Sequence, residues 1–512
     1  MPSKTVTAAK LILSDITLFS RAVLQMPLRP YQQIPLQPII VSIVQRQGLE
    51  FLIVMPRQTG KNEMLAHLIV YLLNLFQRKG GNIVFGAIGD GLGRMITRVE
   101  ERLANKWNGT AWYKKSKPTR RMLGNAAAVF ISSSVQAHAR GETAQILLLI
   151  DELQDQDPAH LEAVFEPMRA AENATAVYIG TVRLKSDALW LKKEELERME
   201  QEDGIQRVFL VYPDDITPSN PHYGRFLAAK IRRYGRKHPI IASEYFLEPI
   251  DAASGLFPAR RIALMRGRHP QIHQPEKGKA YVMLIDVGGQ DEAATDPVAR
   301  LQNPGRDYTT ATIIEIDTSK RRPRYRAVDI FVDQGSRHFQ EYPGRPSLAD
   351  RLAAYARHWQ VAHIVCDATG VGEGLADFLA SEFPNRVTQF KFTAVSKAQL
   401  GSDFISIIET GRFQYWQDEV DYSDSWWFFT QAEACTYSLA PEQPFERGLR
   451  WSVKNSHTTP TPTGPQPTHD DRLLSAALLA KIDEMYRDSV LNIGAALSAV
   501  IDATDPLDDM EF

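Results

Sequence analysis

Carboxylates stand at the ends of apolar runs in two separate parts of this 512-residue chain. Apolar runs of five to seven residues favour buried strands of a parallel sheet, and ligands of such sheets sit at the carboxyl ends of the strands. Six carboxylates lie at a strand end or a helix start of this kind: Asp151, Glu152, Asp286, Asp367, Asp470 and Asp471. Clustered carboxylates are costly without a cation, and oxygen ligands favour Mg²⁺ or Mn²⁺ over zinc.

A candidate phosphate-binding loop precedes the first pair of carboxylates. The stretch 49–63, LEFLIVMPRQTGKNE, predicts a buried strand, a tight turn and a helix whose amino-terminal amides face an anion. The usual G-x-x-x-x-G-K-[ST] pattern has Gly where Met55 stands and a hydroxyl where Asn62 stands, so the prediction rests on context. The residues expected to contact the nucleotide or its Mg²⁺ are Arg57, Gln58, Thr59, Gly60, Lys61 and Asn62.

The carboxylates at the end of run 146–150 complete this candidate ATP site. Asp151 suits a Mg²⁺ ligand and Glu152 suits activation of the attacking water, whereas the alternative is an acidic helix cap. Thr181, at the end of the apolar run 174–181, occupies the position expected of an element that touches the γ-phosphate. These features together predict ATP with Mg²⁺ as the cofactor of the first half of the chain.

Three further residues are candidates for this site. Arg57 and Arg140 can each stabilise a transferring phosphoryl group, although either can equally be a solvated surface charge. Gln32, in the sequence LRPYQ at 28–32, can hydrogen-bond an adenine edge. The alternative for LRPYQ is a surface turn, because Pro30 is expected to interrupt any helix.

The second carboxylate set predicts cleavage of a phosphodiester. Two Mg²⁺ or Mn²⁺ ions about 3.5–4 Å apart can clamp the attacking water and the leaving oxygen. Asp286, Asp367 and one of Asp470 and Asp471 are the expected ligands, Asp307 is a possible addition, and each alone can be a turn or cap residue. His469 is a candidate helper, or simply a residue at the start of the helix.

A basic run at 319–326, SKRRPRYR, is expected to grip a nucleic-acid backbone near these carboxylates. The alternative is a solvated hairpin tip.

The patterns around these residues predict two α/β domains. Alternating strands and helices over 49–212 favour a doubly wound parallel sheet. Strands over 280–289, 307–317 and 324–333 favour an antiparallel meander, and a helix and a further strand at 362–367 follow it.

Composition limits the class of protein. The formal net charge of −2 requires any nucleic-acid binding to use local basic patches. Two cysteines supply neither a disulfide framework nor a zinc site, and no apolar run reaches the roughly 20 residues needed to cross a bilayer. We therefore expect a soluble intracellular protein that is not secreted and has no membrane partner.

The motifs as an ordered set resemble the large terminase subunit of tailed phages. The resemblance covers nearly the whole chain: LRPYQ as adenine motif, PRQTGKN as phosphate loop, LLLIDE as Mg²⁺ and catalytic strand, IGT as coupling motif, and then Asp286, Asp367 and HDD. It implies an N-terminal P-loop ATPase domain of the RecA/ASCE-like kind with a parallel sheet, and a C-terminal RNase H-like α/β nuclease domain. The expected limits are 1–200 for the ATPase with its arm, 201–262 for a lid and linker, 263–488 for the nuclease and 489–512 for an acidic tail.

The resemblance also implies roles and partners. Lys61 and Asn62 hold phosphate and Mg²⁺, Asp151 binds the metal, Glu152 is the base, and Arg140 and Arg57 match the proposed trans and cis arginine fingers. The run D-R-L-L-S-A-A favours Asp471 over Asp470 as the third nuclease ligand. The implied activities are an ATPase that drives double-stranded DNA into a procapsid and an endonuclease that cuts concatemeric DNA. The implied partners are a portal protein, a small terminase subunit and four further copies in a ring, in the host cytoplasm.

Two rival functions remain open on the sequence. One is an ATPase-nuclease of host DNA repair or defence, without a portal partner. The other is an inactive prophage remnant that binds only nucleotide or DNA. The presence of every expected carboxylate disfavours the remnant.

Asn62 generates the first testable prediction, because a hydroxyl is the usual residue at its position. The Asn62→Thr variant is expected to hydrolyse ATP faster than the natural protein, since a hydroxyl is the usual Mg²⁺ ligand there. Steady-state ATP turnover at saturating ATP measures this effect. A slower variant would show that the amide is the better ligand in this loop.

Overall fold

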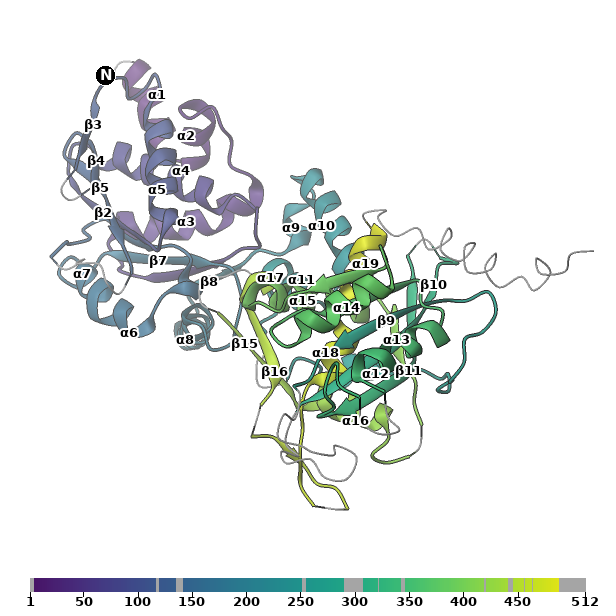
Figure 1. The fold of residues 1–512 in the computed structure, drawn as a ribbon. Coiled ribbons are helices and arrows are strands. Elements are labelled where there is room, and N and C mark those ends of the chain that lie inside the picture. Colours follow the sequence, from purple (N-terminus) through teal and green to yellow (C-terminus); the bar gives the residue numbers. More distant parts are fainter. Residues whose placement is uncertain are drawn as a thin grey trace, which may run out of the picture. The chain divides into compact units, whose positions relative to one another are not determined.

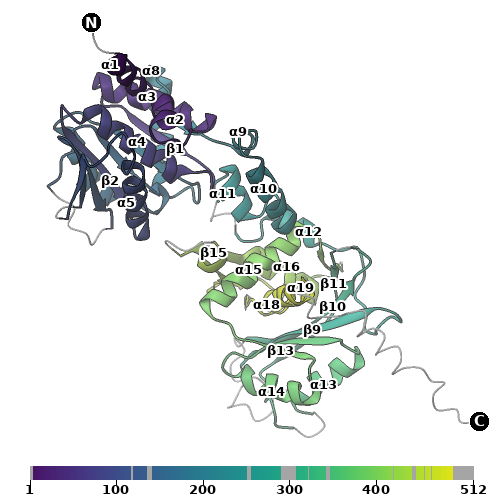
Figure 2. The same cartoon turned by 90° about the horizontal axis from the view of Figure 1, so that it is seen from above.

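The computed structural model describes residues 4–116, 119–134, 141–250, 255–289, 307–320, 322–341, 346–418, 420–440, 445–454, 456–462 and 464–487. The chain forms two compact units (Figures 1 and 2). The first unit comprises Met1–Ile231 and Pro239–Asp251, and the second comprises Arg232–His238 and Ala252–Phe512. Arg140 and the predicted tail 489–512 lie outside the described residues.

The first unit is built on an eight-stranded sheet in the order β3-β4-β5-β2-β6-β7-β1-β8. Strands β5, β2, β6, β7, β1 and β8 are parallel, and β3 and β4 extend the sheet as an antiparallel edge. The strands are β1 (Glu50–Val54), β2 (Gly81–Ala87), β3 (Trp112–Lys115), β4 (Arg120–Leu123), β5 (Ala126–Ser132), β6 (Leu147–Ile150), β7 (Thr175–Gly180) and β8 (Val208–Leu210). Strand β7 lies between β1 and β6, so the phosphate loop and the first carboxylate pair follow strands that are one strand apart.

Helices cover both faces of this sheet, which explains why its central strands are almost continuously apolar. Helices α4 (Lys61–Phe76) and α5 (Asp90–Leu103) pack on one face. The other face forms a core with a 3₁₀ turn at Leu153–Asp155, a π turn at Leu161–Phe165, and helices α6 (Pro158–His160), α7 (Glu166–Ala170) and α8 (Ala188–Asp203). The sheet is thereby closed on both sides except at its strand ends.

The amino-terminal segment is more helical than the sequence analysis predicts. It forms α1 (Lys4–Leu13), α2 (Ile16–Ala22) and α3 (Pro30–Gln45). The expectation that Pro30 interrupts a helix is wrong, because Pro30 is the first residue of α3. Proline is tolerated there, since the first N–H groups of a helix have no intrahelical partner.

Residues 201–251 do not all form a separate lid. Strand β8 pairs with β1 in the main sheet, so this sheet extends past the boundary expected at residue 200. Helices α9 (Pro213–Ile216), α10 (Pro221–Tyr234) and α11 (Pro239–Phe246) follow it. The finer division of the chain into four parts stays a prediction.

The second unit contains a six-stranded sheet in the order β13-β12-β9-β10-β11-β14. The strands are β9 (Ala280–Asp286), β10 (Tyr308–Asp317), β11 (Arg324–Gln334), β12 (His363–Asp367), β13 (Val387–Phe390) and β14 (Phe413–Tyr415). Strands β9, β10 and β11 form the predicted antiparallel meander. Strand β12 lies parallel to β9 on its other side, because α13 carries the chain back across the sheet.

Helices also sandwich this second sheet (Figure 2). Helices α13 (Leu348–His358) and α14 (Gly372–Glu382) cover one face and enclose an apolar core that includes the buried Trp359. The other face carries α15 (Ala394–Glu409), α16 (Asp424–Ala434), α18 (Asp471–Ala477) and α19 (Leu479–Arg487). The remaining elements are α12 (Ala259–Met265), α17 (Phe445–Gly448), and the short hairpins β15 (Cys435–Leu439) with β16 (Leu449–Val453) and β17 (Thr458–Thr459) with β18 (Gln466–Pro467).

The predicted fold class is confirmed, since each unit is an α/β sandwich around its own sheet and the first sheet is mainly parallel. Within the described residues, none of the helices combines the length and apolar character that crossing a bilayer requires.

Candidate functional site

The phosphate loop connects β1 to α4. Gln58 and Gly60 both have left-handed backbone, with φ angles of 61° and 83°, and Gly60 is the residue that immediately precedes the helix. A Cβ at Gly60 would also lie 2.8 Å from the side-chain nitrogen of Gln32, so a larger residue would have to displace this amide as well as adopt the left-handed backbone. A turn of this kind before a helix is typical of an anion site formed by backbone N–H groups. The loop therefore fits a nucleotide phosphate.

The LRPYQ segment is hydrogen-bonded to the backbone of the phosphate loop. The Tyr31 hydroxyl donates to the carbonyl of Thr59 at 2.8 Å, and the Gln32 side-chain amide donates to the carbonyl of Gly60 at 3.1 Å. Both side chains are buried, so the alternative of a solvated turn is wrong. Contact of Gln32 with adenine stays a prediction. Its described role is to hold the loop.

Lys61 brings three strand ends together. Its ammonium donates to the Thr181 hydroxyl after β7 and lies 3.7 Å from the Glu152 carboxylate after β6. The Thr181 hydroxyl in turn donates to the carbonyl of Met55 after β1, at 3.1 Å. The predicted residues of the loop, the acidic strand and the coupling strand thus lie in one site.

The environment separates the two neighbouring carboxylates. Burial and the charge of Glu152 raise the pKa of Asp151 to about 6, although Lys61 opposes this shift. Burial also acts to raise the pKa of Glu152, but Lys61 and a hydrogen bond from Gln154 outweigh it, so this pKa lies below its ordinary value. Carboxylates with separated pKa values suit different roles. Asp151, buried beside another negative charge, fits a Mg²⁺ ligand, and Glu152 is ionised as a base must be.

Gln154 has no role in the sequence-based prediction but links two functional residues. Its amide nitrogen donates to Glu152 at 2.7 Å, and its carbonyl oxygen accepts the backbone N–H of Thr181 at 3.1 Å. A Cβ on Gly180 would lie 2.3 Å from that carbonyl oxygen, so the glycine of the IGT motif makes room for Gln154. Glu152 itself has left-handed backbone (φ 48°), a strained conformation for a non-glycine residue.

The arginines of this site differ in how they are held. The Arg57 guanidinium lies 3.4 Å from Glu244 of α11 and is half exposed. Arg94, on α5, was not predicted, yet it lowers the pKa of both Asp151 and Glu152. Arg140 lies outside the described residues, and Asn62 is the partly buried second residue of α4.

The second carboxylate set converges at one edge of the second sheet. Asp286 is the last residue of β9 and Asp367 the last residue of β12, its parallel neighbour. Asp471 is the first residue of α18, whose Ser475 hydroxyl donates to the carbonyl of Leu284 at 2.7 Å. Ser475 lies one turn after Asp471, so this hydrogen bond fixes the start of α18 beside the strand ends.

The positive charge near these carboxylates does not compensate for their burial and mutual repulsion. Burial, and then the charges of Asp471 and Asp367, raise the pKa of Asp286 far above its ordinary value. Burial and Asp307 raise the pKa of Asp471 to about 7, and its buried Oδ2 has no hydrogen-bond partner among the described residues. Burial also raises the pKa of Asp367. This oxygen-rich set fits a divalent cation.

The site is not a closed metal cage in this conformation. In the part of the chain that the structure describes, no three His, Cys, Asp or Glu side chains form a group able to hold an ion.

Asp307 and His469 pair with each other. Asp307 Oδ1 lies 2.6 Å from His469 Nδ1, and this contact lowers the pKa of Asp307 and raises that of His469. A metal-binding role for Asp307 stays a prediction.

Lys397 is a cation at this site that no sequence signal indicates. Its ammonium lies 3.5 Å from Asp470 and 5.3 Å from the centre of the Trp451 ring, and its charge opposes the raised pKa of Asp286. It comes from α15, about 70 residues before the HDD motif, so only the fold brings it there.

The basic run 319–326 does not lie near the carboxylates. Asp286 pairs with Thr310 at the start of β10, whereas the hairpin begins after Asp317 at the end of the same strand. Seven residues of β-strand span about 24 Å. The prediction that this hairpin grips DNA beside the carboxylates is therefore wrong in its placement.

One family model matches the chain. Residues 289–476 match the model of the terminase RNaseH-like domain. The match includes Asp307, Asp367 and Asp471 and begins just after Asp286, and it confirms the resemblance to terminase large subunits for this part of the chain. No curated protein matches the chain.

Solved structures of phage terminases are similar to the chain. The large terminase of a thermophilic bacteriophage has 11% identity, covers 89% of this chain and 99% of its own, and has a TM-score of 0.40. The HK97 bacteriophage large terminase is 13% identical to the chain. The match covers 91% of this chain and 99% of that terminase, with a TM-score of 0.37. The magnesium-bound large terminase nuclease of the thermophilic phage G20c is 15% identical to the chain. The match covers 44% of this chain and 96% of that nuclease, with a TM-score of 0.31. At such low identity and TM-score, no residue role is transferred from them.

The link through Gln154 generates a prediction. Replacing it by Leu removes the hydrogen bonds to Glu152 and Thr181, and bonds to a charged group contribute about 1.5–3 kcal/mol. We expect ATP turnover to fall by roughly 10- to 100-fold while nucleotide affinity stays within a few-fold, because Lys61 and the loop are unaffected. Gln154→Glu separates the two hydrogen bonds, since it keeps an acceptor for the Thr181 N–H but loses the donor to Glu152 and adds a negative charge beside it. Turnover equal to that of the natural protein in Gln154→Leu would remove Gln154 from the site.

Proposed function

We propose that the chain is the large subunit of a phage terminase, in which ATP hydrolysis drives double-stranded DNA into a procapsid and a two-metal endonuclease cuts concatemeric DNA. The observation that carries the proposal is the terminase RNaseH-like match over a unit with three carboxylates at one sheet edge. The same chain supplies a phosphate loop, Lys61 and two carboxylates with separated pKa values in another unit.

In the proposed ATPase reaction, Lys61 and the amino-terminal amides of α4 bind the phosphates. Asp151, with Asn62, would hold Mg²⁺, whose chemistry is to neutralise developing charge on the phosphoryl oxygens. Glu152 accepts the proton of the attacking water, because its carboxylate is ionised at neutral pH. Gln154 orients that carboxylate and connects it to Thr181, which Lys61 also contacts. A change in the contacts of the γ-phosphate can thereby be transmitted through Thr181 to strand β7.

In the proposed nuclease reaction, Asp286, Asp367 and Asp471 would hold two Mg²⁺ or Mn²⁺ ions. The chemistry that such ions supply is activation of a water and stabilisation of the leaving oxygen of the phosphodiester. The Ser475 hydroxyl holds Asp471 in position through Leu284, and Lys397 limits the repulsion among the carboxylates. His469, paired with Asp307, adds a hydrogen-bonded imidazole beside the site.

The proposed partners follow from this function. They are double-stranded DNA, a portal protein, a small terminase subunit and further copies of the chain in a five-membered ring, at the procapsid portal in the host cytoplasm. A repair or defence ATPase-nuclease of the host is the alternative, and a portal gene and a small terminase gene beside this one would favour packaging.

Glu152 carries the first prediction of this proposal. Glu152→Ala is expected to lower ATP turnover by about 10²–10⁴-fold, the usual contribution of a general base, and to leave nucleotide binding intact. Phosphate release and binding of a fluorescent nucleotide measure the two effects. Unchanged turnover would exclude Glu152 as the base.

Asp367 carries the second prediction. Asp367→Ala is expected to abolish Mn²⁺-dependent cutting of plasmid DNA, because one of the converging carboxylates is lost. ATP turnover should be unchanged, so this variant and Glu152→Ala serve as controls for each other. Persistent cutting by the Asp367 variant would remove this residue from the nuclease site.

A further inference from the structure

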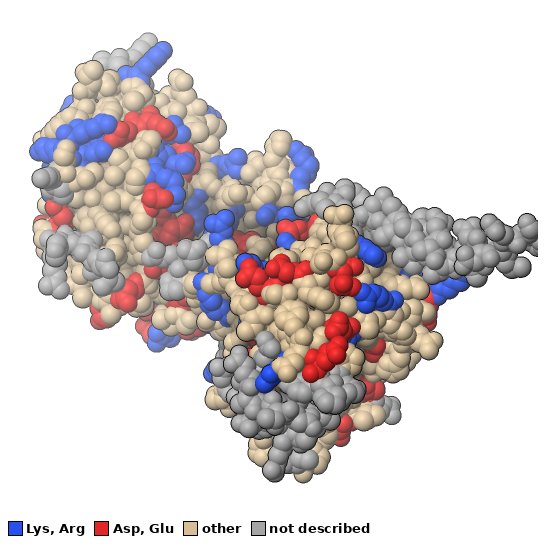
Figure 3. Space-filling view, in the orientation of Figure 1, with Lys and Arg blue, Asp and Glu red and all other residues tan. Residues whose placement is uncertain are grey.

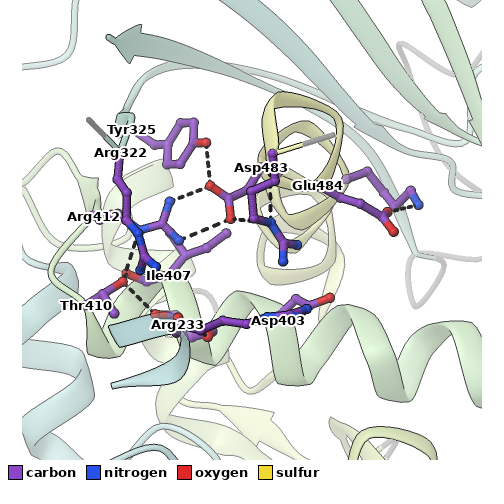
Figure 4. A network of polar contacts seen from close by, with 12 residues as sticks. Arg233, Arg322, Tyr325, Asp403, Ile407, Thr410, Arg412, Asp483 and Glu484 are labelled. Atoms are coloured by element: carbon purple, nitrogen blue, oxygen red, sulfur yellow. Dashed lines mark hydrogen bonds and ion pairs between the residues drawn. The ribbon is translucent and has the colours of Figure 1, made fainter. Parts of the chain in front are cut away.

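A second polar site lies in the same unit as the terminase domain, away from the carboxylates. It is a cavity of about 360 Å³ whose charged lining residues define what we call the arginine pocket: Arg233, Arg322, Asp403, Arg412, Asp483 and Arg487 (Figure 4). These side chains come from the end of α10, the β10–β11 hairpin, α15, the segment before β14, and α19. We propose that the arginine pocket binds a phosphodiester of duplex DNA.

The floor of the arginine pocket is a buried ion pair that is already satisfied. The Arg412 guanidinium donates to both carboxylate oxygens of Asp483, with Nη2 at 3.1 Å from Oδ2. The Tyr325 hydroxyl donates to Asp483 Oδ1 at 2.8 Å, and Arg412 Nε donates to the Thr410 hydroxyl at 3.0 Å. Figure 4 shows these contacts converging on Asp483. A paired floor of this kind is rigid and has little net charge.

The rim of the arginine pocket carries the remaining positive charge. Arg233, Arg322 and Arg487 are exposed and come from three different segments. Arg322 donates to the backbone carbonyl of Arg232, which ties the hairpin to the end of α10. The Arg233 guanidinium lies 4.9 Å from the centre of the Tyr234 ring, and its charge acts to lower the pKa of Asp403. The rim therefore adds positive charge from three segments, although Arg487 also lies 3.5 Å from Asp483.

The acidic lining does not cancel this charge. Asp483 is occupied by Arg412 and Tyr325, and Arg487 approaches it at 3.5 Å. Asp403 is the other carboxylate of the lining, and its amide partner Gln399 donates to it at 2.9 Å. Burial raises the pKa of Asp403, whereas the charges of Arg487 and Arg233 act to lower it. Four arginines thus face two carboxylates, and the excess favours an anion.

Phosphate is the anion that this chemistry suits best. The planar guanidinium forks of arginine match phosphate oxygens and bind them in pairs. Exposed Lys320 and Arg324 of the hairpin continue the basic surface beyond the rim. A charge on an open rim suits a polyanion that lies across the surface, such as a DNA backbone, better than an enclosed small ligand. Figure 3 shows both signs of charge over each unit, so such binding must rely on a local patch of this kind.

The distance between the arginine pocket and the carboxylates of the proposed nuclease site sets the minimum length of a duplex that contacts both. This step rests on the proposed function. The hairpin begins about 24 Å from Asp286, measured as seven residues of β10. At about 3.4 Å per base pair, that distance corresponds to about seven base pairs of duplex. A duplex that is cut at the carboxylates can therefore reach the arginine pocket only if it extends at least that far.

The test measures DNA affinity of the full chain, with Asp367→Ala present in every protein to prevent cutting. Blunt duplexes of increasing length are titrated between low and moderate salt. Arg233→Glu is the pocket variant, because Arg233 is exposed at the rim and its backbone carbonyl, rather than its side chain, accepts the Ser406 hydroxyl. Arg386→Glu is the matched control, since Arg386 is also exposed and its guanidinium lies over an aromatic ring, Phe383, at 5.7 Å.

We expect Arg233→Glu to weaken binding of long duplexes by about tenfold at low salt and to reduce the salt dependence by about one phosphate contact. Arg386→Glu should leave both quantities unchanged. Arg487→Gln, a milder change on another element, should weaken binding in the same direction. A thermal melt of each variant confirms that it is folded.

Three outcomes overturn the inference. Equal affinities and salt slopes for Arg233→Glu and Arg386→Glu would exclude the arginine pocket while leaving the proposed function intact. A loss of inorganic phosphate binding in Arg233→Glu without a loss of DNA affinity would assign the pocket to free phosphate. No duplex binding by the Asp367→Ala protein itself would overturn the proposed function and this inference together.

Discussion

The burial of like charges at strand ends is the constraint on which both candidate sites depend. Asp151 and Asp286 are almost completely buried, and each faces a second carboxylate that raises its pKa. Such a carboxylate destabilises a fold unless a cation compensates it. An enclosed sheet keeps these residues in place because the apolar strand that carries each of them is packed on both faces.

The two sites meet this constraint in different ways. In the first unit, Lys61 supplies a resident cation, so Glu152 stays ionised while Asp151 keeps a raised pKa. In the second unit, the cation Lys397 pairs with Asp470 and not directly with Asp286. The carboxylates of the second unit are therefore the less compensated set.

Residues outside the two groups of candidate metal ligands determine the geometry of both sites. Gln154 joins the end of β6 to the end of β7, and it fits only because Gly180 has no side chain. Ser475 joins α18 to β9 and so sets the position of Asp471. Each link is a hydrogen bond to backbone or carboxylate between elements far apart in sequence, so a small shift of one element is passed to the other.

The sequence by itself determined the strands, because long apolar runs can only be buried, and it determined that carboxylates follow them. That was enough to predict the fold class. It also indicated the loop at Gly60 and Lys61 and the second carboxylate set as candidate sites, whose roles stay predictions. Only the tertiary structure decided what lies across from these residues. Lys397 and Arg94 reach their sites through folding, and no local pattern marks them. Gln154 stands only two residues after Glu152, but its second hydrogen bond, with Thr181, depends on the fold. The basic hairpin was misplaced for the same reason: its charge is local, but its distance from Asp286 is set by the register and length of β10.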